Sequence, residues 1–170
     1  ELFFDDVCVP ATQRLGEEGQ GFAYLMQELP RERLSISMMA LGSILGAIEL
    51  TKDYVLERKA FGQPLSQMQN TRFVLANAQI KAKAAQAFVD QCAALYQQHL
   101  LSVTQVAALK CFITDVQCEV IDQLLQLFGG YGYMQEYPIS RFFVDARVQK
   151  IYGGTNEIMK EIVARELLGK

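Results

Sequence analysis

The chain has 170 residues, a formal net charge of −3 and 51% hydrophobic residues, which fits one globular domain with a substantial core. Its pI near 5.2 and its mixed charges argue against nucleic acid or an anionic membrane surface as a partner. Four scattered cysteines indicate a reducing compartment rather than a disulfide scaffold or a zinc site. The single histidine, His99, leaves a histidine-based metal site and a Ser-His-Asp triad without support, so we predict no metal.

The first ten residues predict a β-strand, with apolar positions from Leu2 to Val9 and a stop at Pro10. Because a lone strand has no partner in the rest of the sequence, it indicates a preceding β-domain. We therefore assign residues 1–16 to the last strand of that domain and a linker, and residues 17–170 to a C-terminal helical domain.

The same segment is acidic where a signal peptide would be basic, and no apolar run approaches the ~20 residues that a membrane span needs. We expect no membrane insertion.

A long amphipathic helix is predicted from about Gly19 to Arg58, with a kink at Pro30 where a backbone hydrogen bond is lost. Its near-heptad apolar stripe consists of Leu34, Met38, Leu41, Leu45, Ile48 and Val55. The breaker segment 61–64 separates it from a second long helix, whose alanines predict close packing and whose stripe consists of Phe73, Ala76, Ile80, Ala84, Phe88, Cys92 and Leu95.

A third helix can be capped by Ser102 or Thr104 and should end at Gly129. Its stripe consists of Val106, Leu109, Ile113, Val116, Val120, Leu124 and Leu127. A shorter fourth helix should run from Thr155 to about Leu168, after a short segment that Pro138 opens. The pattern predicts an all-α fold, an antiparallel up-down four-helix bundle with the N-terminal strand left over.

Two glycine tracts, residues 128–133 and 152–157, are the most informative local feature. Glycine beside helices costs roughly 1 kcal/mol relative to alanine, so the tracts indicate sharp turns or close approach to a ligand. The second tract opens a helix whose free N–H groups suit a carbonyl oxygen or an anion. A dinucleotide fingerprint is excluded because the first tract follows a helix and Gln135 replaces the third glycine.

Two charged segments have both a functional and an ordinary interpretation. Glu32 lies between Arg31 and Arg33 and would be a solvated helix residue, unless the proline kink turns it into a cavity that raises its pKa and makes it a base. Arg58 ends the long helix as the helix dipole favours, or it binds a pyrophosphate beside an aromatic ring.

Six motifs in this order, spread over nearly the whole chain, resemble the C-terminal domain of acyl-CoA dehydrogenases. They are Leu29–Leu34 (LPRERL), Glu57–Gly62 (ERKAFG), Gln126–Tyr133 (QLFGGYGY), Glu136–Pro138 (EYP), Asp145–Arg147 (DAR) and Ile151–Ile158 (IYGGTNEI). The resemblance implies FAD as the cofactor, α,β-dehydrogenation of an acyl-CoA thioester as the reaction, and an electron-transfer flavoprotein as the electron acceptor. Sharing of FAD between subunits in this family implies a homodimer or homotetramer.

The resemblance also implies where the catalytic base lies. Many members carry a glutamate at the position of Gly153, which here is glycine. A subset similar to the long-chain and isovaleryl-CoA enzymes carries the base on the long helix, in a segment like the one that holds Glu32. The resemblance therefore implies Glu32 as the base, with the N–H of Gly153 near the thioester carbonyl.

Further residues take roles by the same resemblance. Arg33, Tyr152 and Gly154 fall near the acyl-CoA, with Arg33 supporting the base and the thioester. The positions that correspond to FAD contacts are Arg58, Phe61, Gln69, Gln126, Gly130, Thr155 and Glu157.

Without the upstream domains we expect this chain to bind FAD weakly or not at all and to be inactive. The compartment would be the bacterial cytoplasm or the mitochondrial matrix. Two other readings stay open: a non-catalytic helical module for oligomerisation, and a flavin oxidase of the same superfamily.

Overall fold

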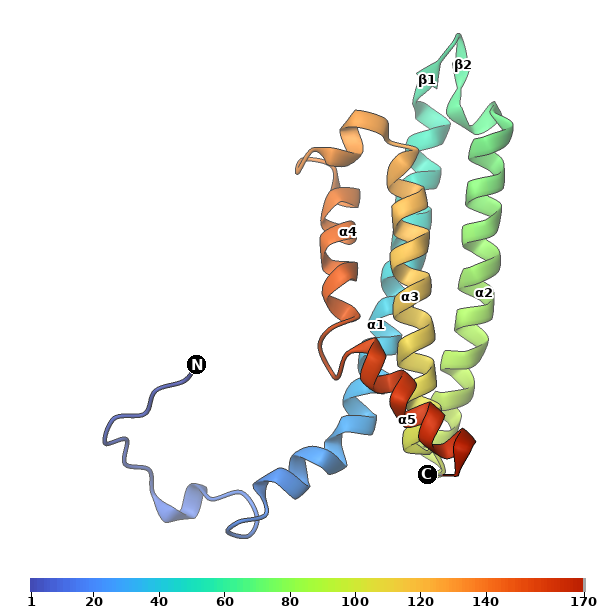
Figure 1. Cartoon of the computed structure of the whole chain (residues 1–170). Helices are drawn as coiled ribbons and strands as arrows, with labels where there is room; N and C mark the ends of the chain where they lie inside the picture. The colour runs from blue at the N-terminus through green and yellow to red at the C-terminus, as the bar shows by residue number, and fades with distance from the viewer. Residues whose placement is uncertain (170) are drawn as a thin grey trace.

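The computed structural model describes residues 1–169 and contains four helices in an up-down bundle, with a fifth across its base (Figure 1). The bundle consists of α1 (Gly21–Glu57), α2 (Gln69–Gln97), α3 (Val103–Gln126) and α4 (Pro138–Gln149), and α5 (Asn156–Leu168) crosses below. The prediction of an all-α, antiparallel bundle is confirmed. The fourth bundle helix is α4 rather than the C-terminal helix, because Ile139 and Ala146 bury one face of α4 in the core.

The connections between these helices are short. A two-stranded hairpin, β1 (Lys59–Ala60) with β2 (Gln63–Pro64), and the 3-10 turn η2 (Leu65–Gln67) join α1 to α2 at the upper end. The 3-10 segment η3 (Gly129–Tyr133) follows α3 at the same end, and another such turn, η1 (Ala11–Gln13), lies in the N-terminal arm. Ser102 caps α3 in a reciprocal capping box with Gln105, as one of the two predicted caps.

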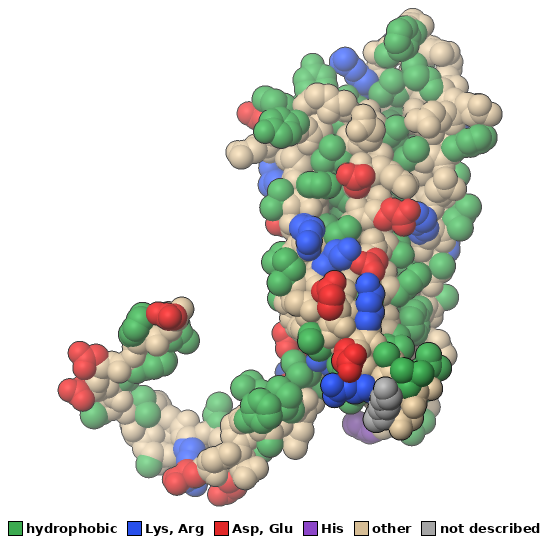
Figure 2. Space-filling model, viewed as in Figure 1, with side chains coloured by type: hydrophobic (Ala, Val, Ile, Leu, Met, Phe, Trp, Pro, Cys, Tyr) green, Lys and Arg blue, Asp and Glu red, His purple; other side chains and the backbone are tan. Residues whose placement is uncertain are grey.

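The first 20 residues leave the bundle as an arm, and the first turns of α1 run at an angle to its remainder, next to Pro30 (Figure 1). The strand expected over residues 1–10 is not formed, because no second strand in the described chain lies beside it. Its apolar side chains, Leu2, Phe3 and Phe4 among them, are exposed. Figure 2 shows this uncovered apolar arm, and it shows charges of both signs interspersed over the visible face of the bundle.

The core lies where α1, α2, α3 and α4 meet. Every predicted stripe residue of α3 up to Leu124 is buried, and small residues bring α2 close to its neighbours, as expected. The predicted face of α2 is wrong in its first half: Phe73 and Ile80 are 58% and 66% exposed, whereas Ala78, Ala82 and Ala85 are buried. On α1, similarly, Met38 and Leu45 face outward, and the core takes Ile36, Ala40, Ile44 and Ala47 in addition to the other stripe residues.

Helix α1 is the one helix among residues 1–169 with the length and composition to cross a membrane, although we expected no apolar run of that size. Half of its most apolar 18-residue window is buried inside the bundle. Since the core helix of a bundle meets the same criterion, α1 is weak evidence for a membrane span.

Candidate active site

The predicted site residues separate into two groups at opposite ends of the bundle (Figure 1). The lower group lies on α1, on the turn between α4 and α5 and on the first turn of α5, and consists of Glu32, Arg33, Tyr152, Gly153, Gly154, Thr155 and Glu157. The upper group lies on the hairpin, the start of α2 and the end of α3, and consists of Arg58, Phe61, Gln69, Gln126 and Gly130.

At the lower end, Arg33 joins α1 to the glycine turn. Its Nε donates a hydrogen bond to the carbonyl oxygen of Gly153 at 3.1 Å, and its side chain is buried, with 5% exposure. Burial lowers the pKa of Arg33, and the neighbouring carboxylate of Glu32 opposes this effect. The preceding arginine, Arg31, points to solvent and pairs with Glu28, so the two arginines flanking Glu32 have different surroundings.

Both glycines of the turn have backbone conformations that side chains rarely adopt, with φ of +67° at Gly153 and +93° at Gly154. A Cβ at Gly153 would lie 2.4 Å from Cδ1 of Ile36, and a Cβ at Gly154 would lie 2.8 Å from Cε of Met159. The expectation that this tract marks a sharp turn is confirmed. Within residues 1–169 no acceptor takes the backbone N–H of Gly153, which is therefore available to a bound group.

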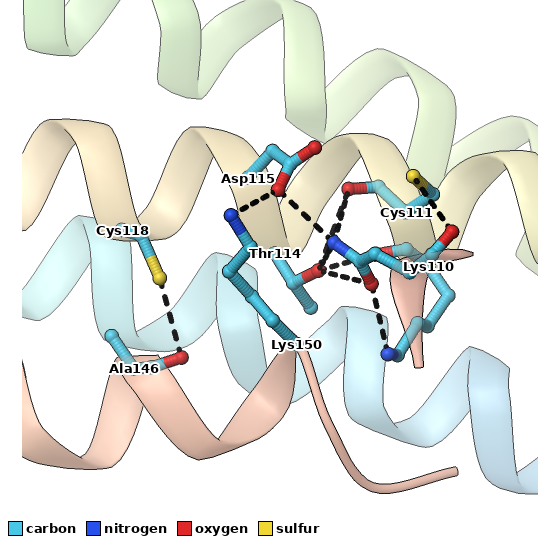
Figure 3. Close-up of polar contacts among 8 residues, drawn as sticks. Lys110, Cys111, Thr114, Asp115, Cys118, Ala146 and Lys150 are labelled. Atoms are coloured by element: carbon cyan, nitrogen blue, oxygen red, sulfur yellow. Dashed lines mark hydrogen bonds and ion pairs between the residues drawn. The ribbon is translucent and has the colours of Figure 1, made fainter. Parts of the chain in front are cut away.

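A second buried cation, Lys110 of α3, supports the same turn. Its Nζ donates to the carbonyl oxygen of Gly154 at 2.8 Å and to Oδ1 of Asn156 at 3.0 Å, and the side chain is fully buried. Asn156 Nδ2 in turn donates to Oγ1 of Thr114 and to Oδ1 of Asp115, each at 3.0 Å. Lys150 pairs with the same carboxylate at 2.6 Å (Figure 3). We call Lys110, Thr114, Asp115, Lys150 and Asn156 the polar cage.

Glu32 is exposed, so the cavity that was to enclose it is not formed by the described residues. It nevertheless lies close to the turn. Burial raises the pKa of the Tyr152 hydroxyl, and the negative charge of Glu32 raises it further. The carboxylate of Glu32, the phenol of Tyr152 and the N–H of Gly153 therefore belong to one neighbourhood on the surface of the bundle.

Helix α5 begins immediately after the turn. The side chain of Thr155 caps it by accepting from the N–H of Ile158 at 3.4 Å. Glu157 is exposed in the first turn, where the local backbone N–H and the Thr155 side chain lower the pKa of its carboxyl. This end of α5 combines unpaired backbone donors with a capping hydroxyl next to the glycine turn.

At the upper end, Arg58 lies over the ring of Tyr131, 5.3 Å from its centroid, and this contact connects the hairpin to the first glycine tract. Arg58 forms no ion pair within residues 1–169. Phe61 is at the hairpin tip with a positive φ of +52° and 95% exposure. An unpaired guanidinium beside exposed aromatic rings suits a pyrophosphate and a planar ring.

Gln69, Gln126 and Gly130 are exposed at this upper end. An open groove of about 1060 Å³ lies nearby between α3, η3 and α4, lined by residues that include Asp122, Tyr133 and Arg141. None of the predicted cofactor residues lines it. The residues at the upper end that are predicted to contact FAD therefore form an open surface rather than an enclosed pocket.

Sequence reasoning missed Lys110 and gave no role to Asn156. A signal existed, because Lys110 lies beside Leu109 and one turn before Ile113, within the apolar stripe of α3. Asn156 belonged to a quoted motif, and it is buried at 1% exposure with all of its amide hydrogen-bonding directed at the polar cage and α3.

The hydrogen-bond donors at the two ends of the bundle suit some parts of an FAD molecule. The upper end offers a cation and aromatic rings for a pyrophosphate and a base, and the lower end offers backbone donors at a helix start. Within residues 1–169 there is no cluster of three His, Cys, Asp or Glu residues that could hold a metal ion. The four cysteines are unpaired thiols.

The sequence model of the acyl-CoA dehydrogenase C-terminal domain matches residues 19–168. A long-chain specific acyl-CoA dehydrogenase from the mitochondria of Rattus norvegicus is 47% identical over 99% of this chain and 39% of its own length. A crystal structure of an acyl-CoA dehydrogenase from Geobacillus kaustophilus superposes with a TM-score of 0.90 at 43% identity, over 97% of this chain and 43% of that one.

A structure described as the electron transferring flavoprotein of Acidaminococcus fermentans superposes equally well, with a TM-score of 0.90 at 36% identity, over 98% of this chain and 44% of that one. The chain thus spans about two fifths of the length of the relatives that it matches. With its bundle, its glycine turn and its motifs in family order, the chain belongs to the acyl-CoA dehydrogenase family, as a C-terminal domain.

Proposed function

We propose that this chain is the C-terminal part of an FAD-dependent acyl-CoA dehydrogenase that acts on a long-chain or branched acyl-CoA thioester, in fatty-acid or amino-acid catabolism, with Glu32 as the base. The hydrogen bond from Arg33 Nε to the carbonyl oxygen of Gly153 carries the proposal. It brings together two segments that are 120 residues apart, one next to the base and the other with a free N–H.

In this proposal the chain's own residues perform the proton transfer and orient the thioester. Glu32 removes the proton from Cα of the substrate. The N–H of Gly153 binds the thioester oxygen, on which negative charge develops as the proton leaves. Bound FAD supplies the acceptor for the hydride from Cβ. Arg33 fixes the turn against α1, so that base and donor keep their relative positions.

The space around Gly153 supports the choice of base. A side chain at this position would meet Ile36, and the backbone there is left-handed. A glutamate at position 153, as in many members of the family, therefore requires Ile36 to move or to be smaller. Glu32 lies on α1, one helical turn before Ile36, and supplies a carboxylate without any change at Ile36.

The class of substrate and the partners rest on relatives. The rat relative is named long-chain specific and mitochondrial, which supports a long acyl chain and a mitochondrial location. An acyl-CoA dehydrogenase of Bacillus subtilis, 38% identical, supports a bacterial location equally. An electron-transfer flavoprotein as the electron acceptor rests on membership of the acyl-CoA dehydrogenase family. We further propose that the enzyme is a homodimer or homotetramer, that residues 1–16 belong to a β-domain, and that the isolated chain is inactive and binds little FAD.

The test is Glu32→Gln in a full-length enzyme carrying the upstream domains. We expect kcat to fall by about 100- to 10,000-fold, because general-base catalysis contributes this much, with the FAD content unchanged. The matched control is Glu28→Gln, an exposed glutamate one turn earlier that pairs with Arg31, and it should retain activity. Retained turnover in Glu32→Gln would rule out the assignment.

Measurements on the same full-length enzyme distinguish the two alternatives, a non-catalytic helical module and a flavin oxidase. A full-length protein that never binds flavin is a non-catalytic helical module. One that reduces its flavin with acyl-CoA and passes the electrons rapidly to oxygen, with hydrogen peroxide as product, is an oxidase. Rapid-mixing reduction with a panel of acyl-CoA thioesters of different length and branching measures both the reaction and its substrate range.

A further inference from the structure

We propose that Lys110 is a positioning residue of the thioester site, which holds the glycine turn from behind and places a buried positive charge next to it. This inference rests on the proposed function, in which the turn receives the thioester oxygen. It concerns a side chain that lies inside the protein, with no exposed surface, and therefore does not touch the substrate.

The geometry of the peptide bond gives the first reason. In a trans peptide the C=O and the N–H point in opposite directions. Arg33 holds the carbonyl oxygen of Gly153, and Lys110 holds that of Gly154. The two side chains therefore fix the peptide planes on both sides of Gly154, and they direct the N–H groups of Gly154 and Thr155 away from the buried cations.

The two glycines give the second reason. Residues with positive φ and no side chain have much conformational freedom, so a Gly-Gly turn does not keep one orientation by itself. The hydrogen bonds from Lys110 to Gly154 and Asn156 span the turn and connect it to the first residue of α5. The Gly153 N–H belongs to the preceding peptide, so Lys110 acts on it indirectly, by fixing the chain that follows. Without these hydrogen bonds the two glycines could rotate, and the alignment of the Gly153 N–H with a developing charge would be lost.

Charge gives the third reason. Burial lowers the pKa of Lys110 and the nearby Arg33 lowers it further, whereas the carboxylates of Asp115 and Glu157 raise it. Of these carboxylates, Asp115 already pairs with Lys150. The two cations that bind the turn, Arg33 and Lys110, have no carboxylate hydrogen-bonded to them within residues 1–169. Their field therefore acts on the turn in a medium of low dielectric, where it favours negative charge on a bound oxygen.

The experiment uses the full-length FAD-containing enzyme and compares Lys110→Met with Lys81→Met. Lys81 is a partly exposed lysine of α2 that pairs with Glu119, so the control likewise removes one lysine charge, together with an ion pair that Lys110 does not form. Turnover of acyl-CoA is measured first. A second readout is the pKa of the Cα–H in a bound acyl-CoA analogue with sulfur in place of the β-carbon, which can lose this proton but cannot transfer a hydride.

We expect Lys110→Met to lower kcat by about tenfold with little change in KM. This is less than the ~100- to 1,000-fold loss found when a direct oxyanion donor is removed. The pKa of the bound analogue should rise by about one unit, which corresponds to a tenfold change in ionisation. Lys81→Met should change neither. Lys110→Gln, which keeps a neutral donor, should show an intermediate effect and also serves if the methionine variant folds poorly.

Unchanged kcat and analogue pKa in the folded Lys110 variants would overturn the inference. So would equal effects in the Lys110 and Lys81 variants, because they would show a general loss of stability or charge. A wild-type enzyme that turns over no acyl-CoA would refute the proposed function itself, whereas an active wild type with insensitive Lys110 variants refutes only the role of Lys110.

Discussion

The two ends of the bundle differ in how far the chain completes them by itself. At the lower end, Arg33, Lys110 and Asn156 are buried, and their hydrogen bonds fix a turn that follows more than 40 residues after Lys110. At the upper end, Arg58 and Phe61 are exposed, with one aromatic contact between them and the first glycine tract. A buried cation without hydrogen-bond partners destabilises the folded state, so its partners must be in place when the chain folds. An exposed cation is solvated by water and needs no partner until a ligand binds.

This difference suggests a division of roles. The lower end is organised before any ligand binds, which favours precise placement of a reacting group. The upper end presents a cation and aromatic rings on an open surface, which favours contact with a group that another part of the assembly holds. If this division holds, substitutions at the lower end destabilise the fold, whereas substitutions at the upper end have little effect on its stability.

The largest effect is expected from Asn156→Ala at the lower end. It removes the Oδ1 that accepts from Lys110 and the amide that donates to Thr114 and Asp115. Breaking a buried, charged network in this way should lower the free energy of unfolding by about 3 kcal/mol, measured by urea denaturation of this chain. Asn77→Ala, at an exposed position of α2, should change it by less than about 0.5 kcal/mol.

A loss below about 1 kcal/mol in Asn156→Ala would show that the polar cage contributes little, and that the lower end is no more rigid than the upper.

The next effect is expected from Gly153→Ala, compared with Gly62→Ala in the hairpin. Both glycines have positive φ, +67° and +79°, so both substitutions incur a backbone strain of about 1 kcal/mol. Only at Gly153 does the added Cβ meet a neighbour, Cδ1 of Ile36, which should add about 1–3 kcal/mol of overpacking. Thermal unfolding of both variants measures the difference.

The matched test repeats Gly153→Ala in an Ile36→Ala background. Removal of the isoleucine side chain should reduce the additional cost at position 153. Equal destabilisation at Gly62 and Gly153, or no coupling to Ile36, would contradict the close packing of the turn.

The smallest effect on stability is expected from Arg58→Ala at the upper end. An exposed cation–π contact contributes about 0.5–1 kcal/mol, so unfolding of this chain should change by no more than this. In the full-length enzyme the same change should weaken FAD binding by about tenfold, measured by flavin release during dilution, because a charge-assisted contact is lost.

Arg165→Ala, which removes an exposed arginine of α5 that pairs with Glu161, is the control and should leave FAD binding unchanged. Normal FAD affinity in Arg58→Ala would remove the upper end from the cofactor site.

The sequence predicted α1, α2, α3 and α5 in their order because apolar periodicity is local information, but it left α4 as a short segment without an assigned helix. The predicted buried face of α2 was wrong, because Phe73 and Ile80 are apolar but exposed to solvent. The alanines that pack into the core contribute too little hydrophobicity for periodicity to identify their face. Sequence reasoning placed Arg33 at the site only through family resemblance. Lys110 was missed although it lies within the apolar stripe of α3, because periodicity does not reveal Gly154 and Asn156, the distant partners that accept hydrogen bonds from its buried amine.

The length of helix α1 sets the distance between the two ends of the bundle. From Glu32 to Arg58 it runs without interruption, and at a rise of 1.5 Å per residue it separates these two residues by roughly 39 Å. One extended dinucleotide is too short to touch both. If both ends serve FAD, they serve two different molecules of it, so each bundle contributes to two active centres and each active centre needs two bundles. A substitution at one end of α1 would then impair a different cofactor site from a substitution at the other. Mixed oligomers of two such variants would recover some intact sites that neither variant forms alone.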